Sequence, residues 1–319
     1  MPAVPEGVRG AVIRGWGTAL PPKVVTNNDL ASYMDTSDEW IVERTGIRER
    51  HVGGTTAGLS VESGRMAIER AGVDPASIEV LVLATTTPDQ TVPATSAQVQ
   101  HELGLRCGAF DVNAACSGFM YGLVAAHGLI GAGMKRALVI GTDSLSRITD
   151  WDDRGTAILF ADGSGAVVLE AVDGPGQLLA WDMDADGSAR RFLYPDVGGH
   201  IVMDGKAVFR RAVRVMVDSA TRTLKHAGVS AEDVALVVPH QANVRIIEHA
   251  VKRLGIPEDR VVVNVDRYGN TSSGSIPLAL ADAAAEGRLR QGRLVLMTGM
   301  GAGLTWGSTL IEWNGGNGG

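Results

Sequence analysis

The sequence predicts an α/β fold in which two similar halves each hold a β-sheet between layers of helices. One observation is an internal duplication: "ERAGVDPASIEVLVLATTT" (69–87) resembles "KHAGVSAEDVALVVPHQA" (225–242), and the Ala-Gly-Val at 71–73 returns at 227–229. A second is that the predicted strands are apolar along their whole length, as in strands covered on both faces. A third is the segment order, which runs helix, strand, helix, strand, strand in both halves.

The repeated part of the first half opens with a helix over "SVESGRMAIERAG" (60–72). Gly72 is suited to the C-terminal cap of this helix. Apolar and β-branched runs bounded by turn residues then predict the remaining elements. They are a strand at "VLVLAT" (80–85), a strand at "GAFDVNA" (108–114), a helix at "SGFMYGLVAAHGLIGAG" (117–133), and strands at "RALVIG" (136–141) and "GSGAVVLEA" (163–171).

The second half repeats this order, and its first helix, "MVDSATRTLKHAG" (216–228), ends at Gly228, the position that matches Gly72. The later elements are a strand at "LVVP" (236–239), a helix along "NVRIIEHAVKRLG" (243–255), a helix that Pro277 helps to start, and strands at "RLVLMTG" (293–299) and "TWGSTLIEW" (305–313). The stretch "AVDGPGQ" (171–177) is the predicted connection. We therefore expect halves at 1–172 and 173–319.

The composition argues against several classes of protein. With 45% hydrophobic and 20% charged residues the chain is globular, and a net charge of −7 argues against nucleic-acid binding through bulk charge. No apolar run reaches the roughly 20 residues of a membrane span. Two cysteines without a CxxC pair indicate neither a disulfide framework nor a metal site. The N-terminal "MPAVPEGVRG" lacks a signal-peptide pattern, so we expect a cytoplasmic protein, and the final "NGGNGG" is typical of a flexible tail.

Cys116 is the candidate nucleophile. It follows a predicted strand, stands among small residues in "DVNAACSGFM" (111–120), and precedes a predicted helix. A helix N-terminus lowers the pKa of a thiol and so favours the reactive thiolate. The alternative is a buried, inert cysteine, the commoner fate of a lone Cys.

His240 and Asn270 are the candidate hydrogen-bond donors for the same site. His240 ends the strand in "VVPHQANVRII", at the position that matches Ala84 of the first half, and Asn270 lies in the loop "YGNTSSGSIP". An imidazole and a carboxamide can both donate to a developing oxyanion without carrying charge. Taken singly, Asn270 is equally typical of a turn residue. Polar residues at equivalent strand ends of both halves predict one shared crevice.

Four segments together resemble one family. "DVNAACSGF", "VPHQAN", "YGNTSSGSIP" and "GAGLTWGS" are similar to the signature motifs of β-ketoacyl-acyl-carrier-protein (ACP) synthase III, in the thiolase-like superfamily. "TNNDL" (26–30) and "DTSDEWIVERTGIRERH" (35–51) extend the resemblance over essentially the whole chain. It implies a homodimer of five-layered αβαβα subunits. Such enzymes condense an acyl-CoA starter with malonyl-ACP, giving β-ketoacyl-ACP, CoA and CO2, and need no metal or cofactor.

The resemblance also implies a role for each candidate residue. Cys116 would carry the acyl group as a thioester, while His240 and Asn270 would bind the malonyl thioester oxygen and stabilise the enolate formed when CO2 leaves. The backbone N–H groups of Cys116 and Ala302 would form the oxyanion hole for attack on the acyl-Cys carbonyl. Ala302 stands where the family often has glycine, and a backbone donor tolerates this change.

Three further sets of residues are predicted to bind substrates. Trp40, Arg44 and Arg154 resemble the family's contacts to the adenine and phosphates of CoA. The loop 85–96 resembles the segment that caps the acyl pocket of the partner subunit, and Val92 stands where a bulky aromatic residue is common. Basic residues on two predicted helices suit an acidic carrier protein, although each alone is equally typical of a solvated helix face: Arg210, Arg245, Lys252 and Arg253.

Related enzymes differ in their catalytic residues. A thiolase needs a second cysteine in the C-terminal glycine loop, and "TGMGAGLTWG" (298–307) has none. Elongating ketoacyl synthases use a second histidine where this chain has Asn270. A ketosynthase or acyltransferase of secondary, polyketide-type metabolism remains an alternative with the same three residues. A catalytically silent acyl-CoA-binding protein is the alternative of another class.

Overall fold

Two β-sheets form the frame of the molecule in the computed structural model, which describes residues 9–314. The N-terminal stretch 1–8 and residues 315–319 of the expected tail lie outside the described residues. The first sheet has the strand order β1-β7-β6-β4-β5, and the second β8-β13-β12-β11, so matching strands occupy matching places. Their bounds are β1 (Gly10–Ala19), β7 (Asp162–Val172), β6 (Arg136–Ser144), β4 (Val80–Ala84) and β5 (Gly108–Val112), then β8 (Leu178–Ala185), β13 (Thr305–Trp313), β12 (Arg293–Gly301) and β11 (Val234–Pro239).

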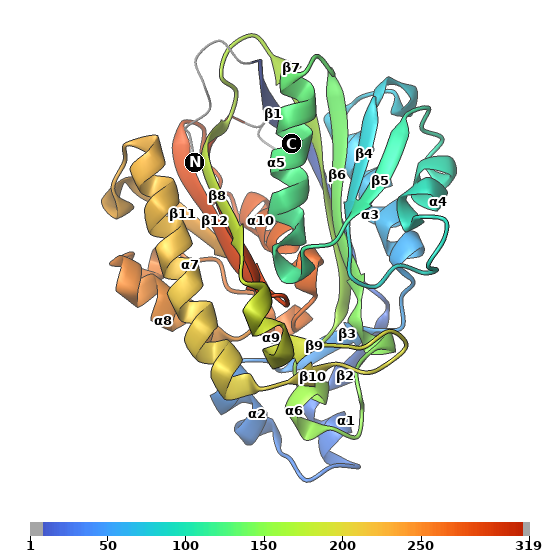
Figure 1. Cartoon of the computed structure of the whole chain (residues 1–319), viewed down its shortest axis with the longest axis vertical. Coiled ribbons are helices and arrows are strands. Elements are labelled where there is room, and N and C mark those ends of the chain that lie inside the picture. The colour runs from blue at the N-terminus through green and yellow to red at the C-terminus, as the bar shows by residue number, and fades with distance from the viewer. Residues whose placement is uncertain (1–8, 315–319) are drawn as a thin grey trace.

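Helices cover both faces of each sheet, which produces the predicted five layers (Figure 1). The outer face of the first sheet carries α3 (Thr56–Ala71) and α4 (Thr95–Glu102). The central layer between the sheets holds α5 (Gly118–Gly131) and α10 (Ser275–Ala285), and the outer face of the second sheet carries α7 (Gly205–Ala227) and α8 (Val244–Leu254). The five-layered αβαβα fold expected from the sequence is therefore confirmed.

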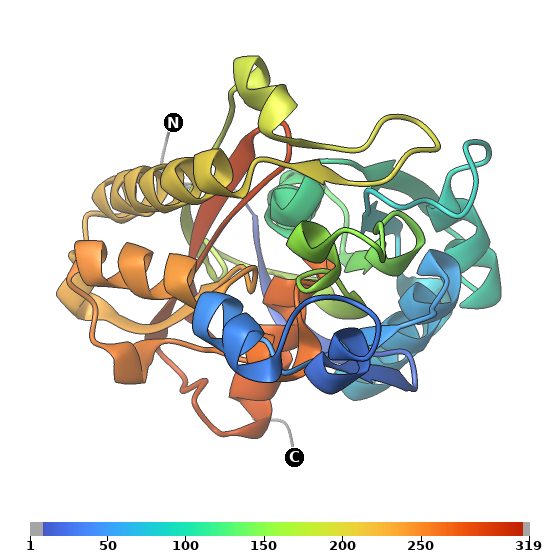
Figure 2. The ribbon, with the colours of Figure 1, turned by 90° about the horizontal axis from the view of Figure 1, so that it is seen from below.

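Shorter elements gather at one end of the molecule, at the bottom of Figure 1 and facing the viewer in Figure 2. They include two small antiparallel sheets and four short helices. These are β2 (Lys23–Thr26) with β3 (Glu49–Val52), β9 (Leu193–Tyr194) with β10 (Val202–Met203), and α1 (Asn27–Ala31), α2 (Asp38–Thr45), α6 (Arg154–Ala157) and α9 (Val265–Tyr268).

The apolar strands have the burial that their sequence predicts. In β4, Val80 and Val82 pack into the central layer, whereas Leu81 and Leu83 pack against α3 and α4. Successive side chains of a strand point to opposite faces, so a strand covered on both sides must be apolar throughout. Full burial of each such side chain contributes about 1.5–3 kcal/mol to folding.

The duplicated helices end as predicted. Gly72 and Gly228 cap α3 and α7 in the left-handed conformation, with φ of +65° and +71°. The outer strands β1 and β8 were not among the predicted elements, although each pairs along the last strand of its half. The second sheet lacks a counterpart of β5, because Val261 forms only an isolated bridge to Val237. Within residues 9–314, no helix combines the length and apolar character needed to cross a bilayer.

Candidate active site

Cys116, His240 and Asn270 line one cavity of about 110 Å³ where the two halves meet. The three side chains come from segments far apart in sequence, and the structure brings all of them together as predicted. Apolar side chains from α7 and α8 line much of the remaining wall: Val208, Phe209 and Ile246, with Met203 and Met300 beside them. A small, mostly apolar cavity with three convergent polar groups has the features of a reaction site.

The position of Cys116 results from a strained turn between β5 and α5. The Asn113 carboxamide oxygen accepts a hydrogen bond from the Ala115 N–H at 3.3 Å, and Ala115 has φ of +47°. Left-handed φ values are uncommon for residues other than glycine and cost free energy. The short 3-10 turn Ala115–Ser117 then places Cys116 two residues before the start of α5 at Gly118.

The thiol of Cys116 is almost completely buried, with 8% of the residue exposed. Burial raises the pKa of this thiol to about 12, and the Ser272 hydroxyl, which lowers it, offsets only part of that effect. The sequence position predicts the opposite direction, because it places the sulfur at a helix N-terminus. The pKa of the buried thiol is raised instead of lowered, because loss of solvation disfavours the thiolate.

His240 follows β11 directly and is 3% exposed. Its backbone N–H donates to the Thr298 carbonyl at 2.8 Å, which holds it against the neighbouring strand β12. Burial lowers the pKa of the imidazole to about 3, so the ring is neutral at physiological pH. Its Nδ1 atom lies 2.7 Å from the Ser275 hydroxyl oxygen.

Asn270 lies in a turn that repeats the geometry next to Cys116. Its side-chain oxygen accepts a hydrogen bond from the Ser272 N–H at 2.9 Å, and Ser272 has φ of +52°. The same bond joins Asn113 to Ala115 in the first half. Because the oxygen is engaged by the turn, the amide N–H groups are the polar atoms left for the cavity. The duplication thus positions both the candidate nucleophile and a candidate donor.

Ala302 follows β12 and does not line the cavity. The preceding Gly301 packs directly against Cys116, since a Cβ atom on it would lie 2.5 Å from the Cys116 backbone nitrogen. The chain after β12 therefore runs alongside the thiol-bearing turn. A backbone role for Ala302 stays a prediction.

Trp40, Arg44 and Arg154 form one cluster at the end of the molecule that carries α2 and α6. The guanidinium carbons of Arg44 and Arg154 lie 4.2 and 4.8 Å from the centroid of the Trp40 ring. Asn243, which lines the cavity, donates to the Arg44 carbonyl at 2.9 Å and so connects this cluster to the first turn of α8. The structure therefore brings these three residues together, outside the cavity wall itself.

The four predicted basic residues are exposed on α7 and α8: Arg210, Arg245, Lys252 and Arg253. Among the described residues none of them lies within 4.0 Å of a carboxylate, whereas Arg211 and Arg214 of α7 pair with Asp186 and Asp218. Their charges are therefore available to an external partner.

Val92 lies outside the cavity of its own chain. It is 80% exposed and does not line the cavity of Cys116. A contact with the acyl pocket of another subunit stays a prediction.

Sequence reasoning missed Ser272 and Ser275, which contact the thiol and the imidazole. Both serines stand in the hydroxyl-rich segment "YGNTSSGS", which contains Asn270 and was a visible pattern. Residue type alone, however, does not indicate which hydroxyl contacts which group. Asp143 was also missed: this buried carboxylate accepts hydrogen bonds from Ser273 in one half and from the loop after β4 in the other.

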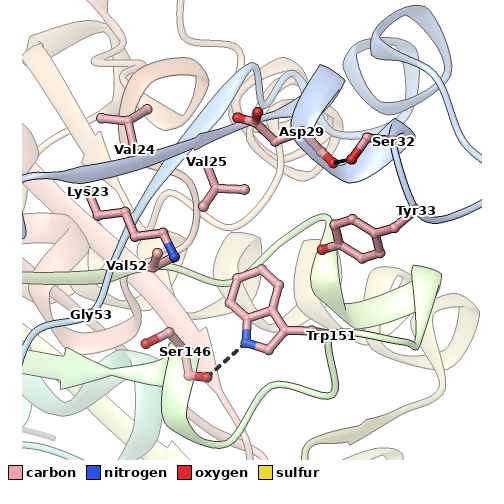
Figure 3. A pocket seen from close by; sticks show the side chains of 10 residues that line it. All are labelled: Lys23, Val24, Val25, Asp29, Ser32, Tyr33, Val52, Gly53, Ser146 and Trp151. Atoms are coloured by element: carbon pink, nitrogen blue, oxygen red, sulfur yellow. Dashed lines mark hydrogen bonds between the residues drawn. The ribbon is translucent and has the colours of Figure 1, made fainter.

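A larger hollow of about 660 Å³ lies beside α1 and contains none of the predicted catalytic residues. Figure 3 shows Lys23, Tyr33 and Trp151 around it, with the Trp151 indole N–H donating to the Ser146 carbonyl. The Asp29 carboxylate is engaged in capping α1. Size alone therefore does not identify the reaction site, and the smaller cavity contains the candidate nucleophile.

Comparisons with known proteins show the family of this chain. Residues 110–187 match the family model described as 3-oxoacyl-[acyl-carrier-protein] synthase III, and residues 224–313 match its C-terminal model. A β-ketoacyl-[acyl-carrier-protein] synthase III of Erythrobacter litoralis is 51% identical over 95% of this chain and 99% of its own.

Solved structures give the same result. The 3-oxoacyl-[acyl-carrier-protein] synthase III of Aquifex aeolicus is 45% identical, with a TM-score of 0.93 over 95% of this chain and 100% of its own. The priming β-ketosynthase of the R1128 polyketide pathway is 37% identical, with a TM-score of 0.90 over 96% of both chains. By sequence and by fold, this chain belongs to the β-ketoacyl-acyl-carrier-protein synthase III family.

Proposed function

We propose that this protein condenses an acyl-CoA starter with malonyl-ACP, giving β-ketoacyl-ACP, CoA and CO2, as the initiating step of fatty acid synthesis. The observation that carries the proposal is the meeting of a thiol, a neutral imidazole and a carboxamide in one buried cavity. The chain is 51% identical to a β-ketoacyl-[acyl-carrier-protein] synthase III and 37% identical to a polyketide-priming ketosynthase, which favours fatty acid synthesis over polyketide synthesis.

In the first half-reaction, the Cys116 sulfur adds to the carbonyl of acyl-CoA. The negative charge on the carbonyl oxygen is stabilised by the backbone N–H groups of Cys116 and Ala302. CoA leaves as a thiolate and takes the proton that Cys116 gives up, and the acyl group stays on the sulfur as a thioester. Because the buried thiol is protonated at rest, its proton must depart as the sulfur–carbon bond forms.

In the second half-reaction, malonyl-ACP loses CO2. The electron pair of the broken carbon–carbon bond is delocalised onto the thioester oxygen, which forms an enolate. His240 and Asn270 donate hydrogen bonds to that oxygen while remaining uncharged. The enolate carbon then attacks the acyl-Cys116 carbonyl, and the new carbon–carbon bond displaces the sulfur. The released thiolate takes a proton from water, which restores the resting enzyme.

The surface around the cavity provides the binding sites for CoA and the carrier protein. Trp40, Arg44 and Arg154 bind the nucleotide end of CoA through stacking and charge. The unpaired cations on α7 and α8 receive the acidic carrier protein: Arg210, Arg245, Lys252 and Arg253. The active unit is a cytoplasmic homodimer in which Val92 of one subunit borders the acyl pocket of the other. Each subunit comprises the halves 1–172 and 173–319, and the reaction uses no metal or cofactor.

Separate assays of the two half-reactions test the catalytic assignment. We expect His240→Ala and Asn270→Asp to retain acylation of Cys116 by acyl-CoA, measured by intact mass. Decarboxylation of malonyl-ACP should fall by about 10²–10³-fold, because each variant removes one donor to the enolate. The Asp variant keeps the size of Asn but replaces its donor by a negative charge.

The matched control is Ser63→Ala, which removes a buried hydroxyl hydrogen bond in α3, away from the cavity. It should retain both half-reactions. Equal loss of acylation and decarboxylation in the His240 and Asn270 variants would contradict their roles. Binding of acyl-CoA without any mass adduct on Cys116 would identify a binding protein instead of an enzyme.

A further inference from the structure

Ser275 contacts His240 and is not among the residues that line the cavity. It is the first residue of α10, is 2% exposed, and its hydroxyl oxygen lies 2.7 Å from Nδ1 of the imidazole. A neutral imidazole has one proton, on either Nδ1 or Nε2, and the distance alone permits both arrangements. In one of them the serine donates to the ring, and in the other the ring donates to the serine.

The surroundings of the Ser275 hydroxyl decide between these arrangements. The backbone N–H of Gln241 donates to the same oxygen at 3.4 Å, so the oxygen already acts as an acceptor. Within residues 9–314, Nδ1 of His240 is the single remaining hydrogen-bond partner of this hydroxyl. Nδ1 of His240 is therefore the one acceptor available to the Ser275 O–H, and the hydroxyl donates its hydrogen bond to that atom. The ring proton is then on Nε2.

The position of the ring proton determines what the imidazole can do in the cavity. With the proton on Nε2, the ring donates to an oxygen that develops negative charge. With the proton on Nδ1, Nε2 would present a lone pair to the same oxygen and repel it. The ring does not take a second proton at physiological pH, because burial lowers the pKa of the imidazole to about 3. One of its two nitrogens therefore has no proton.

We propose that Ser275 is a positioning residue, whose hydroxyl donates to Nδ1 of His240 and so fixes the tautomer that presents Nε2–H to the malonyl thioester oxygen. The proposal rests on the donor role proposed above for His240. Ser275 acts through the imidazole and does not itself touch the substrate. The bond also ties the second sheet to the central helix α10, since His240 follows β11.

Nitrogen NMR of the whole enzyme tests the tautomer directly. Protein labelled with ¹⁵N-histidine is compared with Ser275→Ala, and the His240 signals are assigned by their loss in His240→Gln. We expect the wild-type ring to show a protonated Nε2 and an unprotonated, hydrogen-bonded Nδ1. Ser275→Ala should show exchange between both tautomers. A wild-type Nδ1–H, or an unchanged tautomer in Ser275→Ala, would overturn the proposal.

Kinetics then show whether the tautomer matters for the reaction. Ser275→Ala should acylate Cys116 within about twofold of the wild-type rate, while decarboxylation of malonyl-ACP falls by about 10–100-fold in kcat, with KM little changed. Ser275→Thr keeps the hydroxyl and should recover most of that loss. Ser63→Ala likewise removes a buried serine hydroxyl from a helix, here one bonded to the Ser164 hydroxyl, and should change neither the tautomer nor decarboxylation.

Failure of this inference and failure of the proposed function give different results. If His240→Ala retains decarboxylation, the donor role of His240 is wrong, and the NMR spectra still decide whether Ser275 sets the tautomer. If His240→Ala loses decarboxylation while Ser275→Ala keeps both its activity and its Nε2–H tautomer, the function stands and the positioning role is wrong.

Discussion

At the scale of single residues, burial moves the pKa values of the two reactive groups in opposite directions. Removal of water disfavours whichever form is charged, so the pKa of the Cys116 thiol rises to about 12 and that of the His240 imidazole falls to about 3. Both groups are therefore neutral in the resting enzyme. In the proposed mechanism, a neutral donor suits enolate stabilisation, whereas a neutral thiol must lose its proton during acylation.

The raised thiol pKa predicts a steep pH dependence for the reactivity of Cys116. Only the thiolate attacks an alkylating agent, and below the pKa its fraction grows about tenfold per pH unit. We expect the rate of Cys116 alkylation by iodoacetamide to rise continuously from pH 7 to pH 10, as measured by intact mass. Cys116→Ser gives the background from the half-buried Cys107. A plateau near pH 7 would show that the helix N-terminus outweighs burial.

At the scale of elements, the loop between β4 and α4 combines a fixed base with an exposed tip. The Asp143 carboxylate accepts hydrogen bonds from the Thr86 and Thr87 N–H groups, and Asp89 accepts them from the first residues of α3. Val92, further along the loop, is 80% exposed. A tethered loop with an apolar tip is suited to contact a second subunit.

Enlargement of that tip tests its proposed role as the border of the acyl pocket. We expect Val92→Phe to lower kcat/KM for long acyl-CoA starters about tenfold more than for acetyl-CoA, because a bulky ring fills space that the longer chain needs. The control is Val24→Phe, an equal enlargement at another exposed valine. An identical effect of Val92→Phe on starters of every length would exclude a steric gate.

At the scale of the whole molecule, Asp143 connects the two halves by hydrogen bonds beside the active site. One of its carboxylate oxygens accepts from Thr85, Thr86 and Thr87 of the first half, and the other accepts from the N–H and hydroxyl of Ser273 in the second. Asp143 is fully buried. A charge without solvent is stable only when donors surround it, and here both halves supply them.

Asp143→Asn is therefore expected to destabilise the protein by about 3 kcal/mol, because the new amide N–H groups face donors that lose their acceptor. Urea unfolding measures this change. Asp111→Asn is the matched comparison: its carboxylate caps α4 within the first half at 3.0 and 2.9 Å, and we expect a loss of about 1 kcal/mol. A similar small loss of stability in both variants would show that Asp143 does not hold the two halves together.

Much of the architecture could be predicted because it depends on local patterns. The duplication, the fully apolar strands and the glycine caps at Gly72 and Gly228 are properties of short segments, and each reappears in the structure. The outer strands β1 and β8 were missed because they belong to no recognised repeat pair. The position of Cys116, His240 and Asn270 around one cavity could also be predicted, since Cys116 and His240 come after strands of the two halves and Asn270 lies in the segment that matches the turn before Cys116.

The sequence by itself determined that Cys116, His240 and Asn270 meet, and the tertiary structure decided which further groups contact them and how they behave. Residue order indicated a helix N-terminus next to Cys116 and therefore a lowered pKa, but the surrounding atoms of both halves exclude water and raise it. The Ser275–His240 bond likewise joins segments 35 residues apart. Desolvation and hydrogen-bond direction depend on atoms contributed by distant segments, so they exist only once the chain has folded.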